Sequence, residues 1–216
     1  MREDIITNWL ARTGQALTPR QLSQLARYQG MVLSAPMNLT AIKDDEGFAV
    51  KHFIDSLTLL PWVDKLEPGA RVIDIGTGAG FPGIPLKIAR PGLHVTLLDS
   101  LQKRILFLRS AVAELGLGDV ECIHARAEDY AKQKGPIYHL ATARAVARLE
   151  VLAGYALPLV VPGGVFLAMK GPETAAEIKE AKPVLDRLGG IVESVENVEI
   201  APGVGRSVVV VRKRSY

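Results

Sequence analysis

No apolar segment of the chain approaches the length of a membrane span, and only one of its 216 residues is cysteine. Proline, lysine, arginine or aspartate interrupts each hydrophobic run well before the roughly 18 to 20 residues that a transmembrane helix needs. The first residues, MREDIITNWLART, mix both charge signs and contain no apolar block like that of a secretory signal. We therefore expect a soluble, cytoplasmic protein that has no membrane partner.

Disulfide and metal-binding patterns are also missing. Cys122 cannot form an internal disulfide, and its place within an apolar run favours a core role. The four histidines are far apart in the sequence, at positions 52, 94, 124 and 139. Neither residue type has the spacing that is typical of a zinc site. The sequence predicts no metal site.

The composition is that of a folded globular protein. Hydrophobic residues make up 48% of the chain and charged residues 23%, which argues against intrinsic disorder. A chain of this length most often forms one elaborated domain. Lysine and arginine number 26 against 23 aspartates and glutamates, an excess that permits a polyanionic partner without requiring one.

Residues 1–66 are predicted to form a helical cap. Thr18 is an expected N-cap followed by Pro19 at the first helical position, and this helix should end near Pro36. A second helix is expected to run from Asp44 or Asp45 to residues 61–63. Both helices should cover a larger core domain at residues 67–216.

From residue 71 onwards, short apolar runs alternate with stretches of helical period, a pattern typical of a parallel sheet flanked by helices. A Pro-Gly turn at 202–203 predicts that the last two runs form an antiparallel hairpin. We expect a doubly wound, Rossmann-like α/β fold with strand order 3-2-1-4-5 and one antiparallel strand. The seven predicted strands are residues 71–76, 94–99, 120–124, 138–143, 164–170, 191–200 and 206–212.

A glycine-rich loop, in VIDIGTGAGFPGIPL, joins the first predicted strand to a helix. Gly76, Gly78, Gly80 and Gly83 let the backbone approach a ligand closely, and the helix N-terminus suits a polar group. The last three glycines also fit the G-x-G-x-x-G spacing of dinucleotide folds. Asp74 favours the D-x-G-x-G-x-G pattern of S-adenosylmethionine-dependent methyltransferases instead, because a carboxylate suits the ammonium group of that cofactor.

Two further segments extend the predicted cofactor site. Asp99 ends the second predicted strand, where a carboxylate can accept hydrogen bonds from both ribose hydroxyls, and it can also cap the following helix. Ala127 and Glu128 follow the third strand, where methyltransferases of this architecture usually contact the adenine. For Glu128, a solvated carboxylate at a helix start is an equal alternative.

Several basic side chains are candidate contacts to a polyanion. Arg144 and Lys170 end the fourth and fifth predicted strands beside the glycine loop, so either can reach the cofactor or the acceptor. For each basic residue taken singly, solvated surface charge is the alternative. The candidates are Lys103, Arg104, Arg126, Arg144, Arg148 and Lys170.

The sequence lacks the motifs of two other methyltransferase classes, and this narrows the range of possible methyl acceptors. The segment TARAVARL, after the fourth strand, lacks the Asn/Asp-Pro-Pro-aromatic tetrapeptide that is typical of adenine amino methylation. Cytosine C5 methylation needs a cysteine nucleophile, a role that does not suit Cys122. A ring nitrogen with a free lone pair, such as guanine N7, has no proton to lose and needs mainly alignment and exclusion of water. We therefore assign no catalytic base.

The sequence closely resembles the bacterial glucose-inhibited division protein B family, known as ribosomal RNA small subunit methyltransferase G, over residues 20–212. The resemblance implies a class I S-adenosylmethionine-dependent methyltransferase that modifies N7 of guanosine 527 in 16S rRNA, either free or in the small ribosomal subunit. It rests on NLTAI at 38–42, HFIDSL at 52–57, IDIGTGAGFPGIPL at 73–86, LLDSLQKRILFL at 97–108, RAE at 126–128, ARAVA at 143–147 and MKG at 169–171.

The resemblance also assigns site residues. The family's cofactor contacts fall at Gly76, Phe81, Ala127, Glu128 and Arg144, to which the residues themselves add Gly78 and Asp99. A buried, anchoring aromatic is an equal alternative for Phe81.

One element of the family and one departure from it remain unexplained by the sequence. His52, Asp55 and Ser56 match the family's H-x-x-D-S element, and a packing role is as plausible as acceptor binding, since His52 and Ser56 share a helix face. Before NLT the family often carries an aromatic-Asn-Lys turn, where this chain has Leu-Ser-Ala at 33–35 followed by Pro36.

Two other functions stay open at this point. A small-molecule methyltransferase would need an enclosed apolar acceptor pocket. A non-catalytic RNA-binding or assembly protein would use the cofactor only as a structural ligand. In all three cases a monomer is expected.

Overall fold

Seven strands form one sheet, in the order β3-β2-β1-β4-β5-β7-β6, in the computed structural model, which describes residues 1–144, 147–171 and 174–215. Strands β1 to β5 run parallel to one another, and β7 is antiparallel to both β5 and β6. The predicted Rossmann-like topology with one reversed strand is confirmed. The strands are β1 (Arg71–Ile75), β2 (His94–Asp99), β3 (Val120–His124), β4 (Tyr138–Arg144), β5 (Val160–Lys170), β6 (Gly190–Ala201) and β7 (Val204–Lys213).

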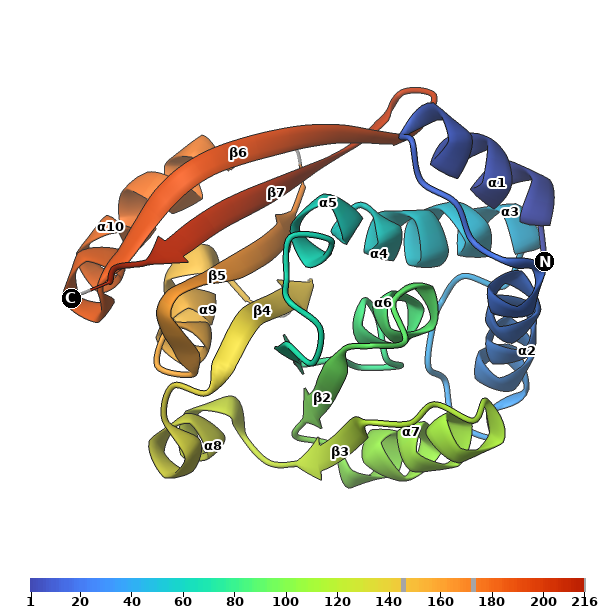
Figure 1. Ribbon diagram of the computed structural model, residues 1–216, viewed down its shortest axis with the longest axis horizontal. Helices are drawn as coiled ribbons and strands as arrows, with labels where there is room; N and C mark the ends of the chain where they lie inside the picture. The colour runs from blue at the N-terminus through green and yellow to red at the C-terminus, as the bar shows by residue number, and fades with distance from the viewer. Residues whose placement is uncertain (145–146, 172–173, 216) are drawn as a thin grey trace.

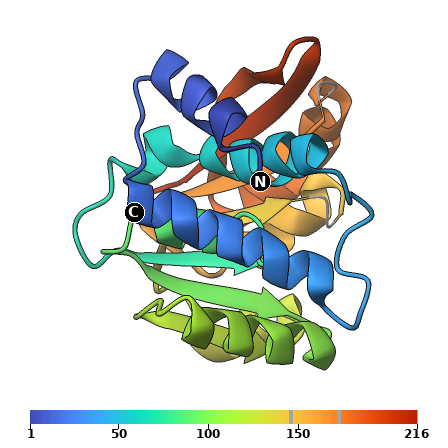
Figure 2. The same ribbon diagram turned by 90° about the vertical axis from the view of Figure 1, so that its right-hand side faces the viewer.

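Helices cover both faces of the sheet (Figure 1). One face carries α8 (Ala127–Lys134), α9 (Leu149–Ala156) and α10 (Ala175–Leu188). The other carries α6 (Gly83–Ala89), α7 (Gln102–Glu114) and the N-terminal helices, of which α1 spans Glu3–Arg12 and α2 spans Pro19–Ser34. Figure 2 shows α2 lying across this second face between α1 and α7.

The two faces have separate hydrophobic cores because side chains alternate along each strand. Val72 belongs to the cluster under the N-terminal helices, and its neighbour Ile73 belongs to the cluster under α8, α9 and α10. The helices of the predicted cap therefore pack directly on the sheet. The capping box at the start of α2 confirms the expected N-cap, since the side chains and backbone N–H groups of Thr18 and Gln21 bond reciprocally.

The prediction of a single helix from residue 44 or 45 to residues 61–63 is wrong in detail. The segment divides into α3 (Asp45–Phe48), a π-helical stretch η1 (Ala49–Ile54), α4 (Asp55–Leu57) and α5 (Leu60–Val63). Pro61 explains the last break, because its ring would clash with the carbonyl one turn earlier in a continuous helix, whereas it fits the first turn of α5. The π-helical stretch is a geometry often found at functional sites, and it carries His52.

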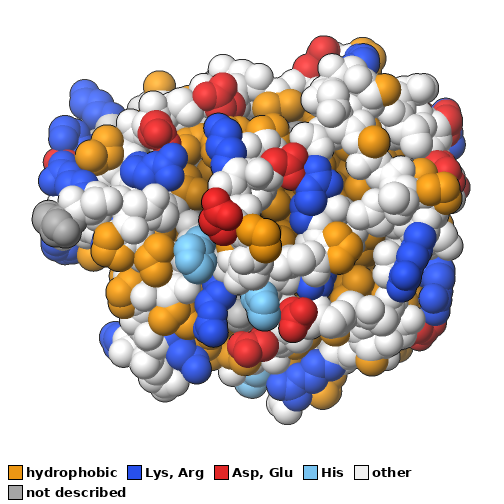
Figure 3. All heavy atoms as spheres, in the orientation of Figure 1, with side chains coloured by type: hydrophobic (Ala, Val, Ile, Leu, Met, Phe, Trp, Pro, Cys, Tyr) orange, Lys and Arg blue, Asp and Glu red, His pale blue; other side chains and the backbone are white. Residues whose placement is uncertain are grey.

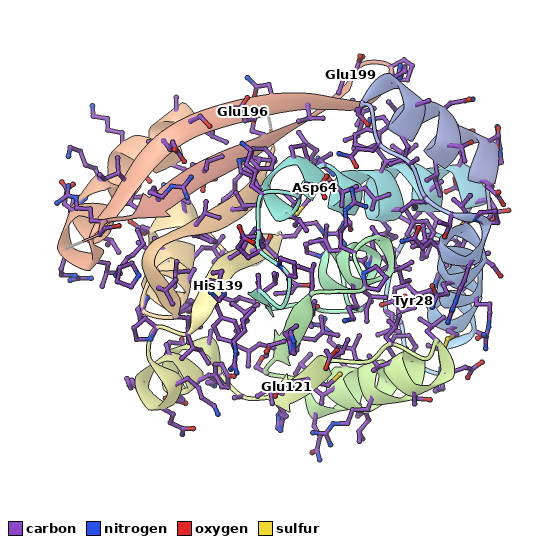
Figure 4. The ribbon with its side chains drawn as sticks, in the orientation of Figure 1. Tyr28, Asp64, Glu121, His139, Glu196 and Glu199 are labelled. Carbon is purple, nitrogen blue, oxygen red and sulfur yellow. The ribbon has the colours of Figure 1, made fainter. Side chains whose placement is uncertain are left out.

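Strands β6 and β7 form a long hairpin that reaches α1 (Figure 1). The expected turn at 202–203 connects them, and Trp9 Nε1 donates a hydrogen bond to the backbone carbonyl of Glu199 at 3.1 Å. Figure 4 labels Glu199 near this end of the hairpin and Glu196 farther along β6. The contact attaches the hairpin to the first helix of the chain.

The described part of the chain contains no group of three or more His, Cys, Asp or Glu side chains placed to hold a metal ion. His139, labelled in Figure 4, instead accepts a hydrogen bond from the backbone N–H of Arg71 at 3.0 Å. No helix within residues 1–144, 147–171 and 174–215 is long and apolar enough to cross a membrane.

Candidate functional site

The glycine loop follows β1 and leads into α6. Gly76, Gly78 and Gly80 have φ values of 67°, 61° and 89°, a region that side chains rarely adopt. A Cβ atom on Gly80 would also collide with the Tyr28 hydroxyl, and one on Gly83 would collide with Leu97 and Asp74. Gly78 has open space around it. Of Gly78, Gly80 and Gly83, only Gly78 therefore leaves room for a ligand against the loop.

Asp74 is fully buried near the end of β1, and its hydrogen bonds link the beginning and the end of the loop. Its Oδ2 atom accepts hydrogen bonds from Thr77 Oγ1 at 2.6 Å and from the backbone N–H of Gly83 at 2.9 Å. Its Oδ1 atom has no hydrogen-bond partner among the described residues. Burial raises the pKa of this carboxyl to about 6. One carboxylate oxygen is therefore unpaired in the interior below the loop.

Asp99, at the end of β2, connects the loop to the start of α7. Oδ2 accepts from the backbone N–H of Gly78 at 2.9 Å and from Arg104 Nη1 at 3.2 Å, and Oδ1 accepts from the backbone N–H of Leu101 at 2.9 Å. A carboxylate has about four acceptor positions, so three are occupied. The alternative in which Asp99 caps the following helix is wrong, because Leu101 is the N-cap of α7 and Asp99 bonds the backbone N–H of that residue, not one within the helix. Arg104, expected as a contact to a polyanion, is instead the partner of Asp99.

A cavity of about 160 Å³ opens at the carboxyl ends of β1, β2 and β3, and we call it the Asp99 cavity. It brings together Gly76, Asp99, Ala127 and Glu128, which the sequence assigned to one site. Gly78, assigned to the same site, does not line the cavity but bonds Asp99, which does. The sequence did not single out Tyr155, which comes from α9. The lining residues are Ile75, Gly76, Leu98, Asp99, Ser100, Ala125, Arg126, Ala127, Glu128 and Tyr155.

Glu128 lies in the first turn of α8 with its side chain exposed. Its own backbone N–H chiefly lowers the pKa of the Glu128 carboxyl, and the nearby Tyr155 hydroxyl lowers it further. The exposure of Glu128 and its place in the first turn of α8 agree with the alternative of a solvated carboxylate at a helix start, and the residue also lines the Asp99 cavity.

Phe81 does not line the Asp99 cavity, because its ring is buried among other aromatic rings. It stacks on His52, with ring centroids 4.5 Å apart, and it also contacts Tyr28 and Phe48. Figure 4 shows Tyr28 reaching from α2 towards this region. The anchoring role proposed as the alternative for Phe81 is present, and it leaves the backbone of the loop available to a ligand.

His52 has both ring nitrogens engaged. Nε2 lies 2.7 Å from Thr40 Oγ1, and Nδ1 accepts from Arg144 Nη2 at 3.3 Å. A guanidinium can only donate, so the neutral tautomer carries its hydrogen on Nε2. Burial and the nearby charge of Arg144 lower the pKa of His52 to about 3. The imidazole is therefore neutral and has no free lone pair.

Asp55 is buried between two arginines from distant strands. Its Oδ2 atom accepts from Arg144 Nη1 at 3.1 Å, and its Oδ1 atom accepts from Arg206 Nε at 3.0 Å. Ser56 Oγ donates to the backbone carbonyl of His52 at 2.6 Å. The H-x-x-D-S element therefore has a structural explanation, because it holds the guanidinium groups that end β4 and begin β7. Arg144, expected at the cofactor, faces this element.

A second cavity, of about 370 Å³, adjoins these arginines at the carboxyl ends of β4 and β5, and we call it the Asp55 cavity. Four of its described lining residues are lysine or arginine and one is acidic. Sequence reasoning missed Arg206, whose place depends on the register of β7 against β5. The lining residues are Ile42, Lys51, His52, Asp55, Arg144, Met169, Lys170, Gly171 and Arg206.

The remaining basic candidates lie in different surroundings. Lys170 lines the Asp55 cavity but is turned inward, where its Nζ atom bonds Glu177 at 2.7 Å and the carbonyl of Ala147 at 2.6 Å. Lys103 is exposed on α7 and lines neither cavity. Arg126 lines the Asp99 cavity, and Arg148 forms an ion pair with Glu180. Residues 145 and 146, in the ARAVA segment, lie outside the described residues.

Cationic and acidic side chains are interspersed on the face seen in Figure 3.

Known proteins that are similar to this chain share one description. A family model described as rRNA small subunit methyltransferase G matches residues 21–204. The ribosomal RNA small subunit methyltransferase G of Pelotomaculum thermopropionicum is 47% identical over 205 residues, which cover 93% of this chain and 85% of that protein. The protein of the same name from Alkaliphilus oremlandii is 43% identical over 202 residues, which cover 92% of this chain and 83% of that protein.

Solved structures with low sequence identity share the fold. A SAM-dependent methyltransferase from Aquifex aeolicus has a TM-score of 0.57 at 19% identity, over 79% of this chain and 94% of that chain. M. jannaschii TYW2 in complex with AdoMet has a TM-score of 0.61 at 17% identity, over 81% of this chain and 80% of that chain.

Proposed function

The chain belongs to the rRNA small subunit methyltransferase G family, and on that premise we propose that it methylates N7 of guanosine 527 in 16S rRNA. It is a class I, S-adenosylmethionine-dependent rRNA methyltransferase. The proposal concerns which base and which of its atoms receive the methyl group, and which residues bind the cofactor and that base. A substrate in small-subunit rRNA implies that the reaction takes place in the cytoplasm.

One observation carries the proposal: the two cavities lie next to each other along the carboxyl edge of the sheet. The Asp99 cavity follows β1, β2 and β3, and the Asp55 cavity follows β4 and β5, which continue the sheet from β1. Arg144, which lines the Asp55 cavity, lies close to the glycine loop, because its guanidinium is 5.2 Å from the ring centroid of Phe81. In open α/β sheets, ligands bind at this edge. One cavity suits the cofactor and its neighbour suits the acceptor.

The residues of the Asp99 cavity fit S-adenosylmethionine, which when bound supplies an electrophilic methyl group. Asp99 keeps one acceptor position for a ribose hydroxyl, and Arg104, with 41% of its side chain exposed, can leave to free another. Glu128 offers an acceptor to the amino group of adenine. The unpaired Oδ1 atom of Asp74 is an acceptor below the loop that would hold the methionine portion.

The acidic and imidazole groups around the acceptor cavity are already engaged. Both nitrogens of His52 and both carboxylate oxygens of Asp55 have partners within hydrogen-bonding distance. Neither group is free to remove a proton from the acceptor. Guanine N7 has an unshared lone pair and needs no base, so this arrangement supports N7 as the acceptor atom. The catalytic contribution of the chain is then alignment and exclusion of water.

Positive charge at the acceptor cavity supports an RNA substrate. The cations of Lys51, Arg144, Lys170 and Arg206 are balanced within the lining only by Asp55. A small-molecule methyltransferase would need an apolar acceptor pocket, which this cavity does not provide. Basic contacts to phosphates position a nucleic acid and make its binding sensitive to salt.

The experiment that tests the function uses ribosomes from a strain that lacks the modification. The protein is incubated with labelled S-adenosylmethionine and either intact small subunits or naked 16S rRNA, and the methyl group is mapped by cleavage at 7-methylguanosine. Cleavage at position 527 alone supports the proposal. A methyl group at another position contradicts it, and cofactor binding without turnover favours the non-catalytic assembly role.

A further inference from the structure

Lys170 is a cation in the lining of the Asp55 cavity, and its counter-charge lies outside that lining. Only 10% of its side chain is exposed, and its Nζ atom forms an ion pair with Oε2 of Glu177 at 2.7 Å. Glu177 belongs to the first turn of α10 and does not line the cavity. Asp55, the one acidic residue in the described lining, is already bonded by two arginines. The charge of Lys170 is therefore balanced by a carboxylate behind the cavity lining.

Glu177 also holds the start of α9. The same Oε2 atom accepts a hydrogen bond from the backbone N–H of Leu149, the first residue of α9, at 2.9 Å. Arg148, the N-cap of that helix, forms no capping hydrogen bond through its side chain. Burial opposes the ionisation of Glu177, but Lys170 and the N–H of Leu149 outweigh it and lower the pKa of Glu177. Glu177 is therefore ionised at neutral pH and is fixed between the end of β5 and the start of α9.

Methylation of guanine N7 moves a positive charge into the acceptor cavity. The lone pair of N7 forms the new N–C bond, the C–S bond breaks and its electron pair stays on sulfur, so the sulfonium charge passes to the purine ring. No proton is released, and a neutral ring becomes a cation. A cation beside the ring opposes this change, and a carboxylate that balances the cation reduces the opposition. The effect is larger in a cavity from which water is excluded.

We propose that Glu177 is a positioning residue of the acceptor site: by pairing with Lys170 it removes one unbalanced positive charge from the wall of the Asp55 cavity and so favours the cationic form of the purine. This inference rests on the proposed function, since it takes guanine N7 as the acceptor atom. It also explains how one cavity can serve two demands. The exposed Lys51 and the arginines of β4 and β7 remain to attract phosphates, while the cation fixed at the end of β5 is neutralised.

Binding of two rRNA fragments tests the inference without turnover. Both contain position 527, and they differ only in whether its guanine carries a methyl group on N7. The measurements are made with S-adenosylhomocysteine present at pH 6, where the methylated ring is a cation. Glu177→Gln keeps an oxygen acceptor for Lys170 and Leu149 but removes the charge. It should weaken binding of the methylated fragment about 3- to 10-fold and change that of the unmethylated fragment by less than about twofold.

A second substitution separates the charge of Glu177 from its contact with α9. Lys170→Gln, added to Glu177→Gln, removes the cation that was left unbalanced and should return the ratio of the two affinities to within about twofold of the wild-type value. Lys170→Gln alone should shift the ratio the other way, in favour of the methylated fragment. This single variant tests the inference even if Glu177→Gln does not fold.

Glu180→Gln is the matched control. Glu180 lies one turn farther along α10, is exposed, pairs with Arg148 and does not line the cavity. This variant should keep the wild-type ratio. In single-turnover methyl transfer, Glu177→Gln should be about 3- to 10-fold slower, with an unchanged affinity for S-adenosylhomocysteine.

The outcomes separate this inference from the function on which it rests. Equal weakening of both fragments by Glu177→Gln, not reversed by Lys170→Gln, would reduce Glu177 to a structural contact of α9. Unchanged affinities for both fragments would remove it from the acceptor site. A wild-type protein that binds neither fragment would contradict the proposed substrate itself. A protein that shows the expected ratios but methylates no rRNA would leave the inference standing and overturn the proposed reaction.

Discussion

His52 stacks face to face on Phe81, with ring centroids 4.5 Å apart and ring planes 13° apart. His52 belongs to the π-helical stretch of the N-terminal segment, and Phe81 belongs to the glycine loop. The contact makes the N-terminal helices part of the structure that supports the site, and it places a neutral imidazole in the wall of the Asp55 cavity.

The stability of the protein should decrease in acid because of His52. Its pKa is lowered from 6.5 to about 3 by burial, so the unfolded chain binds a proton at higher pH than the folded chain. The contribution of the neutral His52 to the free energy of unfolding is fully present above pH 6.5, and it is lost as the pH falls from 6.5 towards 3. His52→Gln should flatten this slope in urea unfolding at pH 7.5, 6, 5 and 4. His94→Gln, at an exposed position, is the control and should keep the wild-type slope.

The titration of Asp74 should change the free energy of unfolding in the opposite direction to that of His52, over an overlapping range of pH. Burial raises its pKa from 3.8 to about 6, so the folded chain holds a proton more tightly than the unfolded chain. Its contribution is present below pH 3.8 and is lost as pH rises through 6, a change of about 3 kcal/mol. Asp74→Asn keeps an acceptor for Thr77 and Gly83 and should remove this dependence. Identical slopes for the variant and the wild type would show that Asp74 does not titrate in this range.

Alanine substitution should lower the free energy of unfolding more at Gly83 than at Gly78. At Gly83, a Cβ atom would meet Leu97 and Asp74, and such overpacking destabilises by about 1 to 3 kcal/mol. At Gly78 there is space, and only the positive φ opposes alanine, at a cost of about 1 kcal/mol. Chemical unfolding measures the difference.

Gly78→Asp should abolish cofactor binding, because it brings a second carboxylate beside Asp99. Calorimetry measures this effect, and normal cofactor binding by Gly78→Asp would remove Gly78 from the site.

Asp99→Ala should weaken binding of S-adenosylhomocysteine by about 1 to 3 kcal/mol, since hydrogen bonds to a charged acceptor are lost. Arg104→Ala is the matched variant, because Arg104 bonds the same carboxylate and would have to leave when a ribose arrives. It should bind the ligand as well as the wild type or better. An unchanged dissociation constant for Asp99→Ala, measured by calorimetry, would exclude the ribose role.

Arg206→Gln should weaken RNA binding in a salt-dependent way. Loss of one phosphate contact reduces the slope of log affinity against log salt by about 1, measured with an rRNA fragment that contains position 527. Arg148→Gln is the control, because Arg148 is an exposed arginine already paired with Glu180 and lies outside the Asp55 cavity. Equal salt slopes for Arg206→Gln and the wild type would mean that Arg206 serves only to pair with Asp55.

Much of the fold and one of the two cavities could be predicted from the sequence. Apolar runs of strand length, with helical periods between them, are local signals, and right-handed crossovers then leave few strand orders. The glycine loop, Asp99, Ala127 and Glu128 meet in one cavity because each follows a parallel strand, and the carboxyl ends of such strands share an edge. The helix from residue 44 or 45 to residues 61–63 failed as one unit, because a π-helical stretch gives the same apolar spacing as an α-helix to within a residue per turn.

The sequence by itself determined the elements, their order in the sheet and the loop that approaches a ligand, because these depend on periodicity, glycine conformation and chain connectivity. The tertiary structure alone decided the partners of the charged groups. Asp55 and Arg206 are 151 residues apart, and they meet only because β7 pairs with β5 in one register beside the π-helical stretch. Tyr155 and Glu128 come together because α9 packs against α8. Long-range side-chain contacts follow from the register and packing of whole elements, which no local pattern of residues encodes.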